Sequence, residues 1–280
     1  MSQILEFACK LFTIGLVRYF LVAGIAFLLM YKVYARKFVS NKIQQRSASP
    51  SDFKREILHS VLSNGIMVVE TVPFYFPPLS KYTLQYPSIA VHGWGYLFLS
   101  VGIALIIHDT YFYWMHRLVH HPRIFPYVHL LHHRSTNPSP WAAYAFHVWE
   151  ALAEGFILVI LLFILPLHSL AIFLFILSSF AINVYGHLGY EIMPRRFRHH
   201  FLFSILNTSV YHNLHHSKFK GNYGLYFRFW DRVMGTEHPD YIRLYDAIQA
   251  RRFPRATSSQ APAGNADALP GATSQIPLVR

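Results

Sequence analysis

Long uncharged stretches constrain the fold of this chain more than any other feature. Five segments, residues 11–31, 57–76, 88–107, 151–165 and 167–186, are apolar enough to span or deeply enter a lipid bilayer. A helix with the 21 residues of the first segment is about 31 Å long, the thickness of a hydrocarbon core. Apolar residues make up 53% of the chain and charged residues only 14%, about half the usual share. So few charges cannot cover a soluble globule, and we expect an all-α integral membrane protein with four to five transmembrane helices.

The five segments differ in how clearly they indicate a crossing. The first segment contains a single basic residue, Arg18, before its last residue Tyr31. No small-residue cleavage site follows it, so we expect an uncleaved anchor. The second carries Glu70 and Pro73 and is the weakest candidate. The fourth is short and contains Glu154, which leaves partial insertion or tilting as alternatives to an upright crossing. Because only Pro166 separates the fourth from the fifth, we expect these two segments to form a tight helical hairpin.

The distribution of basic residues predicts the orientation. Residues 32–55 hold seven Lys and Arg, residues 195–255 hold eleven, and three more flank the central histidines. With five crossings these regions, which contain 21 of the 25 basic residues, lie on one side, while the loop 77–87 on the other side has only Lys81. Loops rich in Lys and Arg stay in the cytoplasm. Topology and attraction to anionic headgroups then account for the net charge of +12, and no nucleic-acid partner is expected.

The chain is expected to divide into three regions. Residues 1–87 contain the N-terminal anchor helices and a basic loop, and residues 88–245 contain the histidine clusters and form the catalytic domain. Residues 246–280 are interpreted as a C-terminal tail. From residue 256 onward this tail is rich in Ala, Pro, Ser, Gly and Thr with no hydrophobic period, a composition typical of disorder.

Histidines are the second unusual feature, because 18 of them stand against 13 acidic residues. Side chains at positions i, i+3 and i+4 share one face of a helix and suit chelation of a metal. Such spacings occur three times, in His116 and His120, in His129, His132 and His133, and in His212, His215 and His216. Eight clustered imidazoles are too many for one ion, so the pattern indicates two metal ions at the ends of membrane helices.

The ligand types narrow the choice of metal. Imidazole suits iron, zinc, copper and nickel, and the single Cys9 excludes a cysteine-rich zinc or iron–sulfur site. Zinc hydrolases usually add a carboxylate base, and no HExxH motif occurs. Two open metal ions at a membrane surface favour redox chemistry on a lipid. A membrane zinc hydrolase and a metal transporter remain as alternatives, because the spacing alone does not separate iron from zinc.

The ordered segments DTYFYWMHRLVHH, HLLHHRSTNPSPWAAYAFHVWEA, YGHLGYEIMP and YHNLHHSKFKGNYGLYFRFWDRVMGT resemble the signatures of the fatty acid hydroxylase / sterol desaturase superfamily. The resemblance covers roughly residues 88–237. It implies a bundle of membrane helices with a cytoplasmic cap of histidines that hold two iron ions, which zinc can replace in purified protein. The implied ligands are the eight clustered histidines together with His187 and His147. The family often has His-Pro at the position of His147, whereas this chain has Val148 next.

Several residues are candidates to support the ligands. Asp109, Tyr113, His116 and His120 fall on one face of a continuing helix. A carboxylate at the end of a membrane helix needs a partner, so Asp109 is predicted to accept a hydrogen bond from a ligand N–H, with an Arg partner as the alternative. Glu150, Glu154 and Glu191 have similar but weaker claims, and residues 222–226 and 230–232 are expected to brace the last cluster. The other histidines are expected to be structural: His59, His92, His108, His121, His168, His199, His200 and His238.

The resemblance implies an O2-dependent di-iron oxidase that hydroxylates or desaturates a membrane lipid such as a sterol or a fatty acyl chain. Hydroxylation is favoured because the wider family does it often. The chain has no GxGxxG, cysteine-based iron–sulfur motif or CxxCH, so we expect electrons from a separate reductase and small carrier. The predicted location is the bacterial inner membrane or the endoplasmic reticulum.

Overall fold

The computed structural model describes residues 2–46 and 48–254, and in this part of the chain all regular elements are helices. Four of them are long and apolar enough to cross a membrane. They are α1 (Gln3–Phe27) with its π-helical continuation Leu28–Val33, α2 (Pro50–Thr71) with the 3₁₀ turn Val72–Tyr75, α3 (Gly93–Val119) and α7 (Ser169–Gly186). Their outer faces carry exposed apolar side chains such as Ile25, Phe98 and Ile106, as a lipid-facing surface requires. The predicted all-α membrane fold is confirmed.

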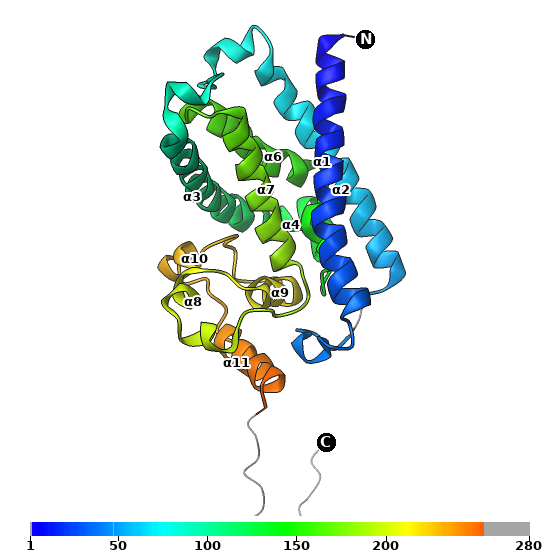
Figure 1. Cartoon of the computed structure of the whole chain (residues 1–280). Coiled ribbons are helices and arrows are strands. Elements are labelled where there is room, and N and C mark those ends of the chain that lie inside the picture. The colour runs from blue at the N-terminus through cyan, green and yellow to red at the C-terminus, as the bar shows by residue number, and fades with distance from the viewer. Residues whose placement is uncertain (1, 47, 255–280) are drawn as a thin grey trace, which may run out of the picture.

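The fourth predicted segment forms α6 (Val148–Ile164), which has 17 residues and is shorter than the four candidate spans. Its far end lies beside the loop that follows α2, because Leu84 N donates to Leu162 O at 2.8 Å and Tyr86 N donates to Leu167 O at 3.2 Å. The far end of α6 therefore lies at the end of the bundle away from the cap (Figure 1). A short connection joins α6 to α7 as expected, but the two helices do not form the predicted tight hairpin, because α6 packs on α2 and α3 and α7 packs on α3.

Close helix packing in the bundle depends on small residues. A Cβ at Gly15 of α1 would overlap the side chain of Asn64 in α2, and a Cβ at Gly155 of α6 would overlap Glu70 of α2. Glycine at such crossings lets two backbones approach without a clash. Helix α2 begins sharply, because Ser49 and Asp52 form a capping box and Pro50 starts the first turn. The core between α3, α6 and α7 is built from buried aliphatic and aromatic side chains: Leu97, Ala104, Ile157, Leu161, Leu162, Ile172 and Phe175.

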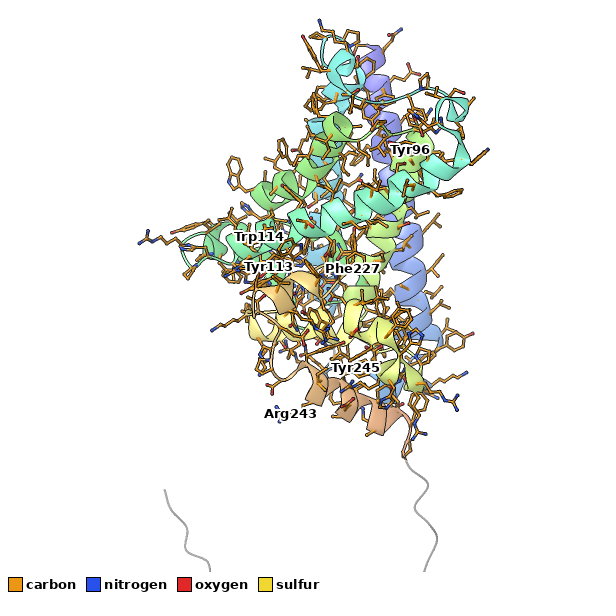
Figure 2. All side chains as sticks on the ribbon, turned by 90° about the vertical axis from the view of Figure 1, so that its left-hand side faces the viewer. Tyr96, Tyr113, Trp114, Phe227, Arg243 and Tyr245 are labelled. Atoms are coloured by element: carbon orange, nitrogen blue, oxygen red, sulfur yellow. The ribbon has the colours of Figure 1, made fainter. Side chains whose placement is uncertain are left out.

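Short helices form a cap at one end of the bundle (Figure 1). They are α4 (Phe125–Val128), α5 (Leu130–His133), α8 (Phe201–Ile205), α9 (Ser209–Lys218), α10 (Phe229–Val233) and α11 (Tyr241–Arg252). Further 3₁₀ turns cover Val39–Asn41, Leu79–Tyr82, Ile89–Val91, Pro140–Tyr144 and Arg195–His199. Figure 2 shows α3 running obliquely from Tyr96 to Tyr113 at the edge of this cap. The cap has its own core, in which buried Arg228 pairs with Glu237 at 2.7 Å and lies over the ring of Tyr241.

One predicted boundary differs from the structure. The tail expected from residue 246 begins later, because α11 continues through Arg252 and its Tyr245 and Ile248 are buried in the cap. Residues from 255 onward lie outside the described residues. The N-terminal helices of residues 1–87 pack against the later helices, since Tyr19 of α1 donates to Trp141 O at 2.9 Å and packs against Phe180 of α7. The N-terminal helices are part of the same bundle.

Candidate metal centre

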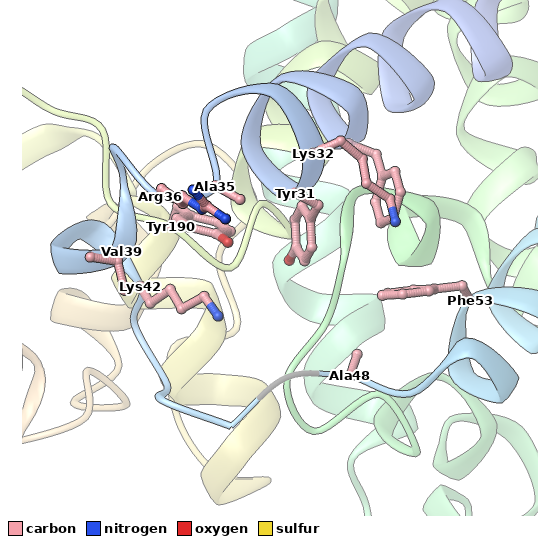
Figure 3. A pocket seen from close by; sticks show the side chains of 10 residues that line it. Tyr31, Lys32, Ala35, Arg36, Val39, Lys42, Ala48, Phe53 and Tyr190 are labelled. Carbon is pink, nitrogen blue, oxygen red and sulfur yellow. The ribbon is translucent and has the colours of Figure 1, made fainter.

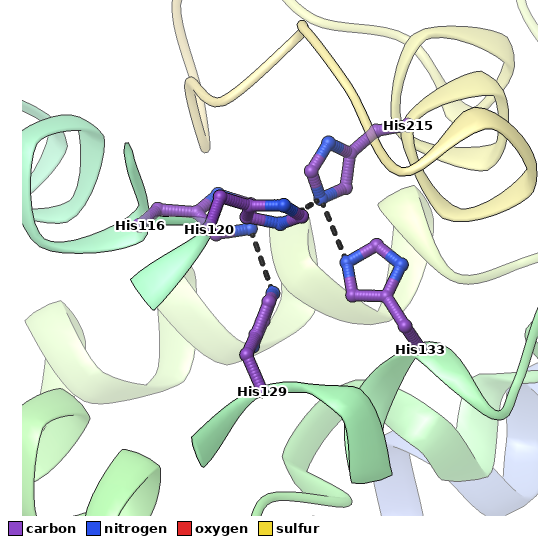
Figure 4. Close-up of side chains that lie close together, drawn as sticks. All are labelled: His116, His120, His129, His133 and His215. Carbon is purple, nitrogen blue, oxygen red and sulfur yellow. Dashed lines mark hydrogen bonds between the residues drawn. The ribbon is translucent and has the colours of Figure 1, made fainter. Parts of the chain in front are cut away.

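Nine histidines converge where the cap meets the bundle, in two groups whose ring nitrogens lie within 4.8 Å of one another. The first group is His116, His120, His129, His133 and His215, and the second is His132, His187, His212 and His216. Figure 4 shows the rings of the first group pointing toward one another from α3, the α4–α5 segment and α9. The two groups are adjacent, because the rings of His133 and His216 stack with centroids 4.7 Å apart. All but the half-buried His120 are buried.

Hydrogen bonds at Nδ1 fix the tautomer of most of these rings. A backbone carbonyl only accepts hydrogen bonds, so a neutral imidazole that faces one must carry its proton on that nitrogen. Four rings do so through Nδ1: His116 with Tyr223 O at 2.9 Å, His187 with Asn183 O at 2.8 Å, His215 with Gly221 O at 2.7 Å and His216 with Ser135 O at 3.1 Å. In a fifth, His129 Nδ1 lies 2.6 Å from Glu150 Oε1. Their Nε2 atoms therefore present lone pairs, the form that binds a metal.

These lone pairs face one another. His187 Nε2 and His216 Nε2 both lie 3.1 Å from His212 Nε2, which carries at most one proton for the two of them. Burial, with the neighbouring imidazoles, keeps the pKa of His129 and of His216 well below its ordinary value. Burial lowers the pKa of His187 to about 4. Neutral rings with opposed lone pairs repel unless a cation lies between them, so the donor set fits metal ions.

The structure corrects one part of the histidine interpretation. Each HxxHH triplet was expected to act as one chelating set, but each is divided between the two groups. His129 and His133 belong to the first group and His132 to the second. In the last triplet, His212 and His216 belong to the second group and His215 to the first. Positions i and i+4 stay together because they lie almost directly above one another, whereas i+3 points to the neighbouring group.

His147 lies outside both groups, although the resemblance implied it as a ligand. Its side chain caps the start of α6, where Nδ1 accepts from Trp149 N at 3.4 Å. Of the eight histidines expected to be structural, none belongs to either group among the described residues. His168 and His200 cap α7 and α8, and buried His108 lies 2.8 Å from the hydroxyl of Tyr226.

The predicted supporting residues have different roles in the structure. Among the described residues, neither a clustered histidine ring nor an Arg pairs with Asp109, so neither predicted partner is found there. Its Oδ1 accepts from the backbone N–H groups of Tyr226 and Phe227 at 2.7 and 3.2 Å, which ties α3 to the cap. Tyr113 stacks on Trp230, and its hydroxyl lies 2.9 Å from Thr236 Oγ1. In the part of the chain that the structure describes, the carboxylate that contacts a clustered ring is that of Glu150.

Glu191 and the turn after α9 hold backbone segments in place. Glu191 accepts from Met193 N at 2.8 Å, and burial raises its pKa. Asp231 accepts from Tyr223 N at 2.9 Å and from Gly224 N at 2.8 Å, which positions the carbonyl that receives the proton of His116. The sequence analysis expected these residues to brace the last histidine cluster, whereas this contact positions His116 of the first. The four carbonyls that fix the tautomers were not found from the sequence, because backbone acceptors leave no residue-type signal.

The similarity of this chain to known proteins covers the region that contains the clustered histidines. The family model for fatty acid hydroxylase matches residues 101–236, which include all nine clustered histidines. A Delta(7)-sterol 5(6)-desaturase of Gibberella zeae is 32% identical over 203 residues, covering 71% of this chain and 61% of that protein. The lathosterol oxidase of Rattus norvegicus is 33% identical over 190 residues, covering 66% and 61% respectively. A Delta(7)-sterol 5(6)-desaturase of Aspergillus fumigatus is 27% identical over 223 residues, covering 72% and 69%.

The chain thus spans about three fifths of the length of the Gibberella and rat relatives. No solved structure matches it.

Proposed function

We propose that this chain, which belongs to the fatty acid hydroxylase / sterol desaturase superfamily, is an O2-dependent di-iron oxidase of a membrane lipid. The observation that carries the proposal is the pair of histidine groups with opposed Nε2 lone pairs. Five and four nitrogen donors leave coordination positions open on an octahedral ion. Iron with open positions supplies the activation of O2 that attack on an unactivated C–H bond needs.

The protein residues hold the donors and keep water away. Glu150 and the backbone carbonyls orient the rings, so that the lone pairs point inward before any metal binds. Apolar rings pack against both groups, with Phe112 4.9 Å from the ring of His116 and Phe146 5.2 Å from the ring of His132. Phe112 precedes His116 by one turn of α3, on the membrane side of the centre. An apolar wall there suits a lipid substrate that arrives from the bilayer, and it excludes competing water.

The names of the relatives favour a sterol and a desaturation. Two of the relatives described above are called sterol 5(6)-desaturases and one a lathosterol oxidase. We therefore infer that the substrate class to test first is a sterol, followed by fatty acyl chains, and that removal of two hydrogens is favoured over insertion of oxygen. This reverses the preference for hydroxylation drawn from the wider family.

The test combines metal analysis with lipid mass spectrometry. Purified chain is analysed for iron and zinc, and lipids of cells with and without the gene are compared. A product about 2 mass units lighter than its precursor indicates desaturation, and one about 16 heavier indicates hydroxylation. The His212→Ala variant serves as the control without product. Zinc in place of iron with a cleaved lipid would support a hydrolase, and metal uptake into vesicles without lipid change would support a transporter.

The hydrolase alternative has a structural difficulty. A zinc hydrolase needs a carboxylate that is free to activate water. Among the described residues, the carboxylate that contacts the clustered rings is Glu150, and its Oε1 is engaged by His129 Nδ1. The arrangement suits a carboxylate that orients a ligand better than one that acts as a base.

Electrons are proposed to come from a separate reductase and small carrier. We expect purified, iron-loaded chain to be inactive with NADPH and O2 until both proteins are added. Turnover with NADPH alone would contradict this proposal.

We also propose that the histidine end is cytoplasmic, because the basic residues of 32–55 and 195–255 are located there. Reporter fusions after residues 47 and 262 are expected to report the cytoplasm for both sites. Opposite sides would contradict an odd number of crossings.

A further inference from the structure

A second hollow lies apart from the histidines, where α1 ends at the cap end of the bundle. It measures about 480 Å³ and is formed by the end of α1, the loop that follows and the segment around Tyr190. Three basic, four aromatic and three aliphatic residues line it: Lys32, Arg36 and Lys42; Phe27, Tyr31, Phe53 and Tyr190; and Ala35, Val39 and Ala48. Figure 3 shows Tyr31 in its wall, with Lys42 extending from one side and Lys32 and Phe53 on the other.

The charge of this hollow has one sign. None of the ten lining residues is acidic. Lys32 and Arg36 are exposed, and Lys42 is half-buried. Three cations around one concave surface attract an anion, and walls of low polarity strengthen that attraction. A phosphate group, with several strong acceptor oxygens, matches two or three such donors.

The walls are held rigidly by aromatic packing. Tyr31 stacks on Phe27 with centroids 4.8 Å apart, and its hydroxyl donates to Leu188 O at 3.0 Å. Tyr190 packs edge-on against Tyr31 at 5.1 Å, and Phe53 packs edge-on against Phe27 at 5.0 Å. These contacts preform the aromatic wall of the hollow, which lowers the entropic cost of binding a ligand there.

The position relative to the bilayer identifies the source of the phosphate. The candidate span of α1 ends at Val33. Leu28, Leu29 and Val33 on its last turns are exposed apolar residues. An apolar helix surface therefore leads directly into a basic hollow at the membrane–water boundary. A phospholipid presents the same two parts in the same order, since its acyl chains lie in the hydrocarbon and its phosphate lies at the surface.

We propose that this hollow binds the headgroup of an anionic phospholipid. Lys32, Arg36 and Lys42 contact the headgroup, and an acyl chain lies along the exposed face of α1. The site is distinct from the metal centre, although Tyr31 touches the segment that follows His187 through Leu188. The proposal concerns binding alone and holds whether or not the chain oxidises a lipid.

Native mass spectrometry of the purified full chain in detergent tests it, with dioleoyl phosphatidylglycerol, dioleoyl phosphatidylcholine and inorganic phosphate as probes. We expect one phosphatidylglycerol to bind at least tenfold more tightly than phosphatidylcholine. Each basic residue near a lipid surface contributes about 1 kcal/mol, or about fivefold. The double variant Lys32→Gln/Arg36→Gln should therefore bind phosphatidylglycerol about 30-fold more weakly. Ala35→Trp, which fills the hollow and keeps its charge, should also lose the tight site.

The matched control is Lys37→Gln/Lys54→Gln, which removes the same charge from exposed positions at the same end but outside the hollow. It should bind phosphatidylglycerol within twofold of the parent chain. Equal loss in both double variants would show general surface attraction and overturn the proposal. Unchanged binding in Ala35→Trp would overturn the shaped site. Displacement of the lipid by millimolar inorganic phosphate would mean a site for free phosphate instead. Iron content of every variant is measured alongside and should not change.

Discussion

Replacing Glu150 tests how the protein prepares its metal ligands. The carboxylate is almost fully buried and lies 2.6 Å from His129 Nδ1, so it holds the ring in the tautomer that presents Nε2 to the first group. Losing such an outer partner costs about 10- to 100-fold in metal affinity, which is about 1.4 to 2.7 kcal/mol. A hydrogen bond to a charged group contributes about 1.5 to 3 kcal/mol, in agreement with that range.

The effect should be graded. Glu150→Gln keeps a neutral acceptor oxygen and should weaken ferrous iron binding about tenfold, whereas Glu150→Leu keeps the bulk without an acceptor and should weaken it about 100-fold. The assay is anaerobic iron titration against a competing chelator, with iron content measured by elemental analysis. This readout does not depend on activity, so it reports on the ligand and not on the substrate.

Glu191→Gln is the control for Glu150. Glu191 is equally buried, but its partners are Met193 N and the hydroxyl of Tyr185, with no clustered ring among them. Its iron affinity should stay within twofold of the parent chain. If Glu150→Leu keeps full affinity, or if Glu191→Gln loses as much, the tautomer argument is wrong.

The division of the nine histidines predicts further results. His212→Ala leaves three donors in its group, so the iron content should fall toward one ion per chain. His120→Ala leaves four donors in the other group, so its iron content should fall less. Equal losses in the two variants would contradict the two-group assignment. Activity should fall by orders of magnitude in His212→Ala, while His200→Ala, outside both groups, should keep turnover within a few-fold. The His147→Ala variant should keep its iron, and its stability should fall by at most about 1 kcal/mol because a helix cap is lost. Loss of iron in this variant would show that His147 is a ligand. In the metal-free chain, the folded pKa of His187 is about 4 against about 6.5 unfolded, so the unfolded state binds more protons between these values. The free energy of unfolding should therefore decrease as the pH falls below about 6.5, by about 2 kcal/mol at pH 5 from this residue alone. Thermal melts in detergent at pH 8 and pH 5 measure the effect. A higher melting temperature at pH 5 would contradict the predicted direction.

The membrane fold could be predicted from the sequence because its cause is local. Long apolar runs need no partner to indicate a membrane helix, since the bilayer itself is the surrounding solvent. The ends of the helices could not be predicted in this way, because they depend on contacts with distant parts of the chain. Helix α3 continues past residue 107 to Val119 and carries its polar last turns into the cap, where Asp109 meets backbone donors from residues more than a hundred positions later. Helix α11 extends through Arg252 because Tyr245 and Ile248 find a buried cap core, which no local pattern reveals.

At the metal centre the sequence by itself determined which residues are available and in which pairs. Spacings of four residues place His116 with His120 and His212 with His216 on one helix face, and the structure keeps those pairs together. Only the tertiary structure decided how the triplets divide, that His187 joins the second group while His147 caps α6, and that Glu150 rather than Asp109 contacts a ring. The physical reason is that a metal site is a convergence of atoms from different helices. Helical periodicity sets the direction of a side chain around its own axis, but the packing of one helix against another sets which side chains meet.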